Sequence, residues 1–150
     1  MKAVNSMRLV LDARSVNEAF ARVSVSAFAS MLDPTVEEIS DIKTAVSEAV
    51  TNCIVHAYQN NFGKIYISAD IFGDGIIRIK IKDRGCGIEN IQQAMTPLYS
   101  SLGGERAGLG FAVMESFMDR IKVRSTPGKG TTVTLEKKIN GKLDNQRKAF

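Results

Sequence analysis

The stretch DPTVEEISDIKTAVSEAVTNCIVHAY, residues 33–58, decides the fold. Its apolar residues recur at steps of three and four, which places on one helix face Ile39, Ile42, Val46, Ala49, Val50, Cys53, Ile54 and Ala57. Thr35 and Glu38 have the spacing of a capping box, and Pro34 suits a first turn, so a helix is predicted to begin there. Glu48 and Asn52, four residues apart, then project together from the surface away from the apolar stripe.

Strands and further helices flank this helix on both sides. Residues 64–82 alternate with period two around an Asp-Gly turn signal, which predicts an antiparallel hairpin. The other predicted elements are a strand at 7–11, a helix from Ser15 with apolar positions Phe20, Val23, Ala27 and Met31, a long glycine-rich loop at 83–110, a helix at 111–117, and strands at 121–124 and 131–137. We therefore predict an α/β sandwich, a mixed and mostly antiparallel sheet covered by helices on one face.

Length and composition favour a single cytoplasmic domain. The chain has 150 residues, 44% of them hydrophobic, which suits one core. We expect one domain over residues 1–139 and a polar, disordered tail over residues 140–150. No apolar run reaches the roughly 18 residues that a membrane span needs, and the charged start of the chain does not resemble a signal peptide.

Charge and cysteine usage exclude several classes of function. Two cysteines and one histidine without a C-x-x-C pair support neither a disulfide framework nor a zinc site. A net charge of +4 is compatible with nucleic-acid binding, but much of the basic excess lies near the C-terminus, in Lys137, Lys138, Lys142, Arg147 and Lys148. A solvated basic tail is the interpretation that we favour, with no direct nucleic-acid contact.

The Glu48 and Asn52 pair has the chemistry of phosphoryl transfer. A carboxylate can accept the proton of an attacking hydroxyl, and an amide oxygen beside it can hold Mg²⁺ on a triphosphate. On an exposed helix face, however, such a pair is far more often only solvated. The pair alone therefore decides little.

Three glycine-containing segments supply the rest of a candidate nucleotide site. In DRGCGI, residues 83–88, the glycines let the backbone approach a flat ligand and the carboxylate can accept from an exocyclic amine. Gly108-Leu109-Gly110 opens a helix, where unpaired N–H groups favour phosphate oxygens. GKGTT, residues 128–132, places hydroxyls at a strand entrance. Each segment is also compatible with an ordinary turn or helix start.

Together and in this order, EAVTNCIVHAY (48–58), DRGCGI (83–88), ERAGLGFAV (105–113) and GKGTTVTL (128–135) resemble the N, G1, G2 and closing boxes of the Bergerat ATP-binding fold. That resemblance covers residues 7–138 and implies ATP or ADP, Mg²⁺ and an ATP lid. NEAFARVSVSAF (17–28) and MESFMDRIKVRSTPGKGTTV (114–133) further resemble the family of sporulation anti-sigma F factors.

The resemblance implies partners that the residue pattern alone does not. It implies a cytoplasmic homodimer that binds the sporulation sigma-F factor in its ATP form and phosphorylates a serine of an anti-anti-sigma protein, its antagonist. A related switch-protein kinase of the general stress pathway is one alternative. A nucleotide-gated module that sequesters its partner with negligible catalysis is another.

The resemblance also assigns roles to individual residues. It makes Glu48 the general base and Asn52 the Mg²⁺ ligand, and it places Arg22 in contact with both protein partners. It assigns the adenine pocket to Asp83, Gly85, Gly87, Ile88 and Thr131, and the phosphate contacts to Gly108, Leu109 and Gly110. Arg106 is the only cationic side chain from Glu89 to Gly110, so we expect it at the γ-phosphate, with a solvated lid arginine as the alternative. His56 is given no catalytic role.

Overall fold

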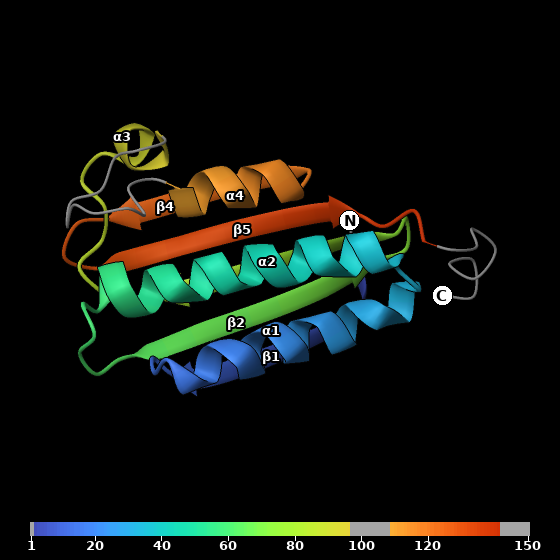
Figure 1. Ribbon diagram of the computed structural model, residues 1–150, viewed down its shortest axis with the longest axis horizontal. Coiled ribbons are helices and arrows are strands. Elements are labelled where there is room, and N and C mark those ends of the chain that lie inside the picture. The colour runs from blue at the N-terminus through green and yellow to red at the C-terminus, as the bar shows by residue number, and fades with distance from the viewer. Residues whose placement is uncertain (1, 97–108, 142–150) are drawn as a thin grey trace.

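The computed structural model describes residues 2–96 and 109–141. Its helices lie over one face of a five-stranded sheet with the strand order β1-β2-β3-β5-β4 (Figure 1). In chain order the elements are β1 (Ala3–Asp12), α1 (Val16–Ala29), a 3₁₀ turn (Ser30–Leu32), α2 (Val36–Asn52), a π-helical turn (Cys53–Ala57), β2 (Lys64–Phe72), β3 (Ile76–Asp83), α3 (Ile91–Met95), α4 (Leu109–Phe117), β4 (Arg120–Thr126) and β5 (Gly130–Lys138).

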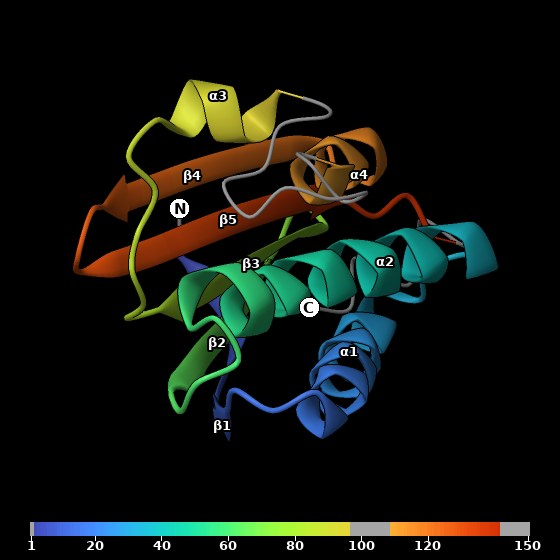
Figure 2. The ribbon, with the colours of Figure 1, turned by 60° about the vertical axis from the view of Figure 1, so that its left-hand side comes forward.

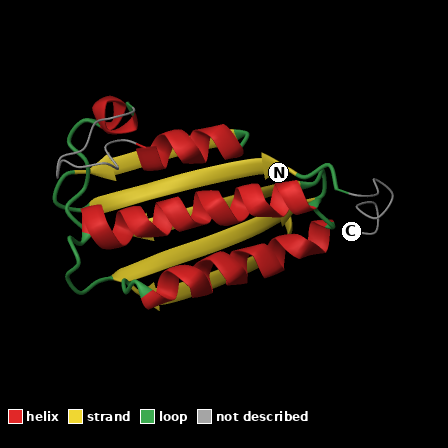
Figure 3. Cartoon of the chain, viewed as in Figure 1, coloured by secondary structure: helices red, strands yellow, loops and turns green. Residues whose placement is uncertain are grey.

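The predicted α/β sandwich is confirmed. The cartoon in Figure 3 shows α1, α2 and α4 on the same side of the sheet. All four strand pairings in the described chain are antiparallel, so the parallel component expected of a mixed sheet is not found there. The hairpin between β2 and β3 turns at Gly75, whose φ of 89° is left-handed and whose N–H donates to Phe72 O at 3.0 Å.

The core lies between the helices and the inner face of the sheet. Isoleucines at alternate positions of β2 and β3 point inward, and Ile65, Ile71, Ile77 and Ile79 are each 0% exposed. The α2 face carrying Ile42, Val46 and Val50 packs onto them and is likewise 0% exposed. Because each fully buried side chain of this size contributes about 1.5–3 kcal/mol, this layer dominates the stability of the fold.

The predicted capping box begins α2. Thr35 Oγ1 accepts from Glu38 N at 3.1 Å, and Glu38 Oε1 accepts from Thr35 N at 2.9 Å. Pro34 precedes the cap and does not stand in the first turn, because Thr35 is the N-cap residue. Glu38 also accepts from Asn140 N at 2.8 Å and from Gly141 N at 3.1 Å, which fastens the chain after β5 to the start of α2.

The predicted helix is confirmed as α1, but the apolar residues that indicate its period are not the ones that it buries. Exposure to solvent is 53% for Phe20, 54% for Val23 and 45% for Met31. The helix instead buries Ala21, Val25, Phe28 and Ala29. Both sets have helical spacing, and only the packing of α1 against α2 decides between them.

Element boundaries also extend beyond the sequence prediction. β1 covers ten residues because its backbone pairs with β2 from Ala3↔Phe72 to Asp12↔Lys64. The short helix α3 was not predicted, since five residues give no measurable helical period. None of the described helices is long and apolar enough to cross a membrane.

Candidate functional site

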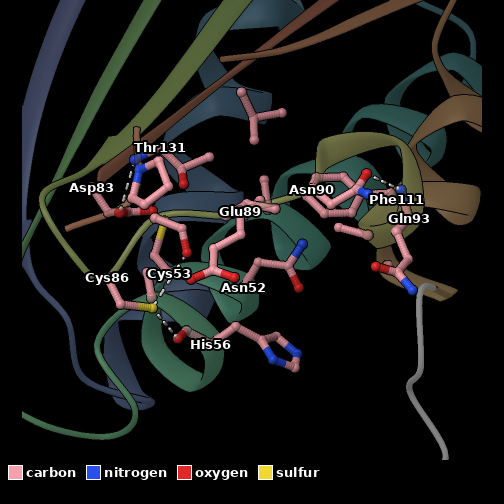
Figure 4. A pocket seen from close by; sticks show the side chains of 18 of the residues that line it. Asn52, Cys53, His56, Asp83, Cys86, Glu89, Asn90, Gln93, Phe111 and Thr131 are labelled. Atoms are coloured by element: carbon pink, nitrogen blue, oxygen red, sulfur yellow. Dashed lines mark hydrogen bonds between the residues drawn. The ribbon is translucent and has the colours of Figure 1, made fainter. Parts of the chain in front are cut away.

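A cavity of about 440 Å³ opens at the C-terminal end of α2. Its walls come from α2 and the π-helical turn, the segment after β3, α3, the start of α4 and the entrance to β5 (Figures 2 and 4). The lining residues are Ala49, Asn52, Cys53, His56, Ala57, Asp83, Cys86, Gly87, Ile88, Glu89, Asn90, Gln93, Ala94, Gly110, Phe111, Pro127, Gly128, Thr131 and Val133. The cavity thus joins the four sequence segments that resemble the ATP-binding boxes.

Asp83 forms one end of the cavity and is only 5% exposed. Its Oδ1 accepts from Gly85 N at 3.0 Å and from Thr131 N at 3.2 Å, and the Cys53 thiol also bonds its side chain. Burial raises the pKa of Asp83, and these three donors offset that effect only in part. Both backbone donors use Oδ1, so Oδ2 accepts from no backbone N–H within the described chain.

The two cysteines of the cavity differ in environment. Cys53 is 3% exposed, and burial followed by the neighbouring Asp83 raises the pKa of its thiol well above the ordinary value. It is therefore a neutral donor to Asp83 and not a nucleophile. Cys86 is exposed, and its Sγ donates to His56 O at 3.4 Å.

The loop after β3 is held tightly against its neighbours. Cys86 N donates to Ala57 O at 3.0 Å, in the π-helical turn that ends α2. A Cβ on Gly85 would clash with that same carbonyl oxygen, and Gly87 combines a φ of 76° with close approach to Thr126 O. Glycine is required at both positions for these reasons. Gly87 lines the cavity, whereas Gly85 lies behind the wall.

Ser125 connects the segments of the wall, and sequence reasoning missed it. Its Oγ accepts from Ile88 N at 2.7 Å, donates to Gly130 O at 3.0 Å and lies 2.8 Å from Thr131 Oγ1. The hydroxyl thus ties the loop after β3 to the entrance of β5. A serine inside a strand gives no pattern from which this contact could have been predicted.

Glu48 and Asn52 converge on the start of α4. An ideal Cβ built on Gly110 would lie 3.2 Å from Asn52 Oδ1 and 3.2 Å from Glu48 Oε2. Asn52 and Gly110 line the cavity, while Glu48 stands one helical turn before Asn52 and is not among the lining residues. A carboxylate oxygen and an amide oxygen therefore meet beside a helix N-terminus.

The remaining predicted residues fall elsewhere. Arg106 and Gly108 lie outside the described residues, and Leu109 is the first residue of α4. Arg22 is on α1 and does not line the cavity; its Nε lies 3.4 Å from Glu18 Oε1 and makes no hydrogen bond in the described chain. No cluster of three or more His, Cys, Asp or Glu suited to a metal occurs among the described residues.

Other residues of the cavity were not predicted to belong to it. Figure 4 shows Asn90, Gln93 and Phe111 away from the Asp83 end, with Asn52 and Glu89 between the two groups in this view. Asn90 caps the short helix α3 by accepting from Gln93 N at 3.0 Å. His56 lines the cavity but was assigned no role. Glu89, Asn90 and Gln93 come from a segment whose sequence is only weakly periodic.

Comparison with known proteins gives the family. The histidine kinase-like ATPase domain family matches residues 10–137. The anti-sigma F factor of Thermoanaerobacter sp. (strain X514) is 56% identical over 140 residues, which cover 93% of this chain and 97% of that protein. The anti-sigma F factor of Clostridium acetobutylicum is 56% identical over 136 residues, 90% of this chain and 94% of that protein. This chain belongs to the anti-sigma F factor family.

Solved structures share the fold of this anti-sigma F factor family member. The RsbU and RsbW domains of a Mycobacterium tuberculosis protein match with a TM-score of 0.66 and 22% identity, over 91% of this chain but 33% of that chain. The histidine kinase domain of the Erythrobacter litoralis blue-light activated histidine kinase matches with a TM-score of 0.53 and 17% identity, over 87% of this chain and 62% of that chain. Membership of an ATPase-domain family implies that this chain binds a nucleotide.

Proposed function

We propose that this protein is an ATP-dependent protein-serine kinase and an anti-sigma factor. In its ATP form it binds the sporulation sigma-F factor, and it phosphorylates a serine of an anti-anti-sigma protein. The observation that carries the proposal is the convergence of Glu48 Oε2 and Asn52 Oδ1 at Gly110, on the edge of a cavity that ends at the buried Asp83. The names of the relatives support the sigma-factor partner.

The Asp83 end of the cavity suits adenine. The Asp83 carboxylate is fixed by backbone donors to Oδ1 and can accept from the exocyclic amine, and Thr131 and Ile88 border the same space. The wall around it is partly apolar, with Ala49, Ala57 and Val133 available to contact a flat ring. The volume of about 440 Å³ falls in the usual range of roughly 300–1,000 Å³ for small-molecule sites.

The other end suits the phosphates. Leu109 and Gly110 stand in the N-terminal turn of α4, and the N–H groups and dipole of such a turn favour phosphate oxygens. Asn52 would hold Mg²⁺, an ion that usually keeps a few protein oxygens together with phosphate oxygens and water. The ion would supply neutralisation of the phosphate charge.

Glu48 performs the proton transfer in this mechanism. Its carboxylate accepts the proton of the attacking serine hydroxyl as the bond from serine Oγ to the γ-phosphorus forms. The bond from that phosphorus to the β–γ bridging oxygen breaks, and ADP leaves. Arg106, which lies outside the described residues, is proposed to neutralise the charge that develops on the transferred group.

Partner binding is proposed at α1. This helix exposes Phe20 and Val23 on either side of Arg22 in the sequence, and Arg22 Nε lacks a hydrogen bond in the described chain. An exposed apolar stripe beside an arginine whose side chain is 36% exposed is typical of protein interfaces, where aromatic residues and arginine are enriched. The proposed homodimer and the partner contacts draw on this surface.

A phosphoryl-transfer assay tests the proposal. The protein is incubated with Mg-ATP and a purified sporulation anti-anti-sigma protein, and the modified residue is mapped by mass spectrometry. We expect phosphoserine on the partner, together with sigma-F binding that is tighter with ATP than with ADP. ATP binding without transfer would overturn the kinase assignment and favour the sequestration module, or a stress-pathway kinase that requires a different partner.

A further inference from the structure

The face of the sheet opposite the helices is strongly basic, and the function proposed above does not use it. Because side chains alternate along each strand, this outer face of β3, β5 and β4 displays Arg78, Lys80, Lys82, Thr132, Thr134, Glu136, Arg120, Lys122 and Arg124. Eight of these residues, all but Lys82, line a groove of about 450 Å³. Figures 1 and 2 show that the helices cover only the other face of the sheet.

The strand register arranges the charges in rows across β5. Lys80 and Lys122 both pair with Thr134, and Lys82 and Arg124 both pair with Thr132. The third row is Arg78, Glu136 and Arg120. With strands roughly 4.8 Å apart, the two cations of a row start about 10 Å apart, and successive rows follow at about 7 Å along the strands. Each row thus places one cation on each side of a central β5 side chain, which is Thr134, Thr132 or Glu136.

Most of these cations have no acidic partner. Glu136 is the one carboxylate of the groove, and its Oε2 lies 2.5 Å from Arg78 Nε. Within residues 2–96 and 109–141, Lys80, Lys82, Arg120, Lys122 and Arg124 form no ion pair, and all five are exposed. A second copy of this chain could not dock here face to face, because the same cations would oppose one another.

We propose that this outer sheet face binds the phosphate backbone of duplex nucleic acid. The groove is lined by charged residues and threonines alone, without the apolar or aromatic anchors that form the centre of protein–protein interfaces. Interfaces with nucleic acid are more polar and more positive, and phosphate contacts need only cations and hydroxyl donors. The lack of an exposed aromatic side chain in the groove also disfavours single strands, which bind by base stacking.

This inference departs from our sequence-based expectation of no nucleic-acid contact. Two of the residues assigned to a basic tail belong to β5, and Lys137 is largely buried, with Nζ 3.3 Å from Asp41 Oδ2. The sequence does not reveal this cluster of cations, because residues 78–82 and 120–124 are far apart in the chain and are brought together only by pairing of β3 and β4 with β5. The proposed binding is backbone-directed, so no sequence preference is expected.

Fluorescence anisotropy with a labelled 25-base-pair duplex over a salt series tests the inference. We expect a dissociation constant of about 10⁻⁶–10⁻⁴ M near physiological salt. Lys122→Gln/Arg124→Gln should weaken binding about tenfold or more and reduce the salt slope by about 2, for any duplex sequence. Lys2→Gln/Lys43→Gln removes the same charge from the residue before β1 and from α2, and should change binding little.

Two further controls distinguish duplex binding by this sheet face from duplex binding by other parts of the chain. A variant with Lys142, Arg147 and Lys148 all changed to Gln tests the C-terminal residues, which lie outside the described range. ATP affinity and thermal unfolding should be the same in every variant, which shows that each has folded. Absence of duplex binding at low salt would overturn the inference, as would binding to polyglutamate or anionic vesicles but not to the duplex. It would also be overturned if the Lys2/Lys43 variant lost duplex binding to the same extent, or if only the C-terminal variant lost duplex binding.

Discussion

Burial disfavours the charged form of Asp83 relative to the same group in water. A carboxylate that is 5% exposed loses the hydration of its charge, and this burial raises its pKa despite the donors from Gly85, Thr131 and Cys53. Such an arrangement costs stability in the empty protein. It is explained if a donor group of the ligand adds a hydrogen bond to the Asp83 carboxylate, since perturbed polar groups are common at binding sites.

Replacing Asp83 by Asn should lower ATP affinity without lowering the free energy of unfolding. The amide keeps an Oδ1 acceptor for Gly85 N and Thr131 N but turns an NH₂ group toward the adenine amine. We expect the free energy of unfolding at pH 7 to stay equal or rise, and ATP affinity to fall by about 1–3 kcal/mol, the cost of an unmade hydrogen bond. Urea unfolding and titration calorimetry measure the two quantities. Unchanged ATP affinity would remove Asp83 from the adenine site.

The raised pKa of Asp83 should also appear in the pH dependence of the free energy of unfolding. Because the pKa of Asp83 is raised above 3.8 by folding, the folded protein binds this proton more tightly than the unfolded chain does. The contribution of Asp83 is therefore fully present below pH 3.8 and is lost as pH rises through the folded pKa. Relative to Asp83→Asn, the stability of the unmodified protein should decrease with pH over this interval. An increase would contradict the assigned environment.

At the scale of elements, α2 links the fold to the site. Its inner face is the core layer, its last turns carry Glu48 and Asn52, and its first turn is fixed by Glu38. Glu38 accepts backbone N–H donors from Thr35, Asn140 and Gly141. One carboxylate thus holds the chain after β5 against the start of the helix whose other end bears the candidate catalytic pair.

Glu38→Ala should therefore cost more than the loss of a simple cap. Thr35→Ala removes one capping bond and should cost about 1 kcal/mol, whereas Glu38→Ala leaves three N–H donors unpaired and should cost about 1–3 kcal/mol. Burial alone would raise the pKa of Glu38, but the donors outweigh it and lower the pKa below 4.5. Its contribution is thus present above pH 4.5 and lost as pH falls through the folded pKa. Chemical unfolding of both variants at pH 7 and pH 4 measures this, and equal costs would contradict the second role of Glu38.

The sequence predicts elements well where a local rule acts and fails where packing decides. The capping box, the Asp-Gly hairpin and the apolar face of α2 follow local rules and are confirmed. The α1 face could not be predicted, because the stripes through Phe20 and Val25 have the same spacing. In the site, glycines and Asp83 have recognisable spacing, while Ser125, Asn90 and Phe111 are brought in only by the tertiary fold.

At the scale of the whole molecule, three surfaces are separated. The cavity opens at the end of α2, the exposed apolar stripe lies along α1, and the basic groove lies on the opposite face of the sheet. Nucleotide, protein partner and polyanion therefore need not compete for the same residues. The helix α2 contacts both α1 and α4 and so connects the cavity with the proposed partner surface.

Phe20→Glu should impair partner binding without unfolding the protein. Phe20 is 53% exposed on the stripe that adjoins Arg22, so a charge there costs little in the free protein but is buried in a complex. We expect sigma-F binding in the presence of ATP to weaken by about 2 kcal/mol, with an unchanged thermal midpoint. Phe62→Glu makes the same change at an 81% exposed position outside the stripe and should bind normally. Normal binding by Phe20→Glu would exclude α1 from the interface.

Phosphate transfer by Glu48→Gln and Asn52→Ala, each with ATP affinity determined on the same sample, tests the central claim most directly. The geometry at Gly110 predicts that Glu48→Gln binds Mg-ATP normally but transfers phosphate to the anti-anti-sigma protein at least about 100-fold more slowly, as for loss of a general base. Asn52→Ala should weaken Mg-ATP binding itself. Normal transfer by Glu48→Gln would contradict the account, because the carboxylate beside Gly110 could not then be the base.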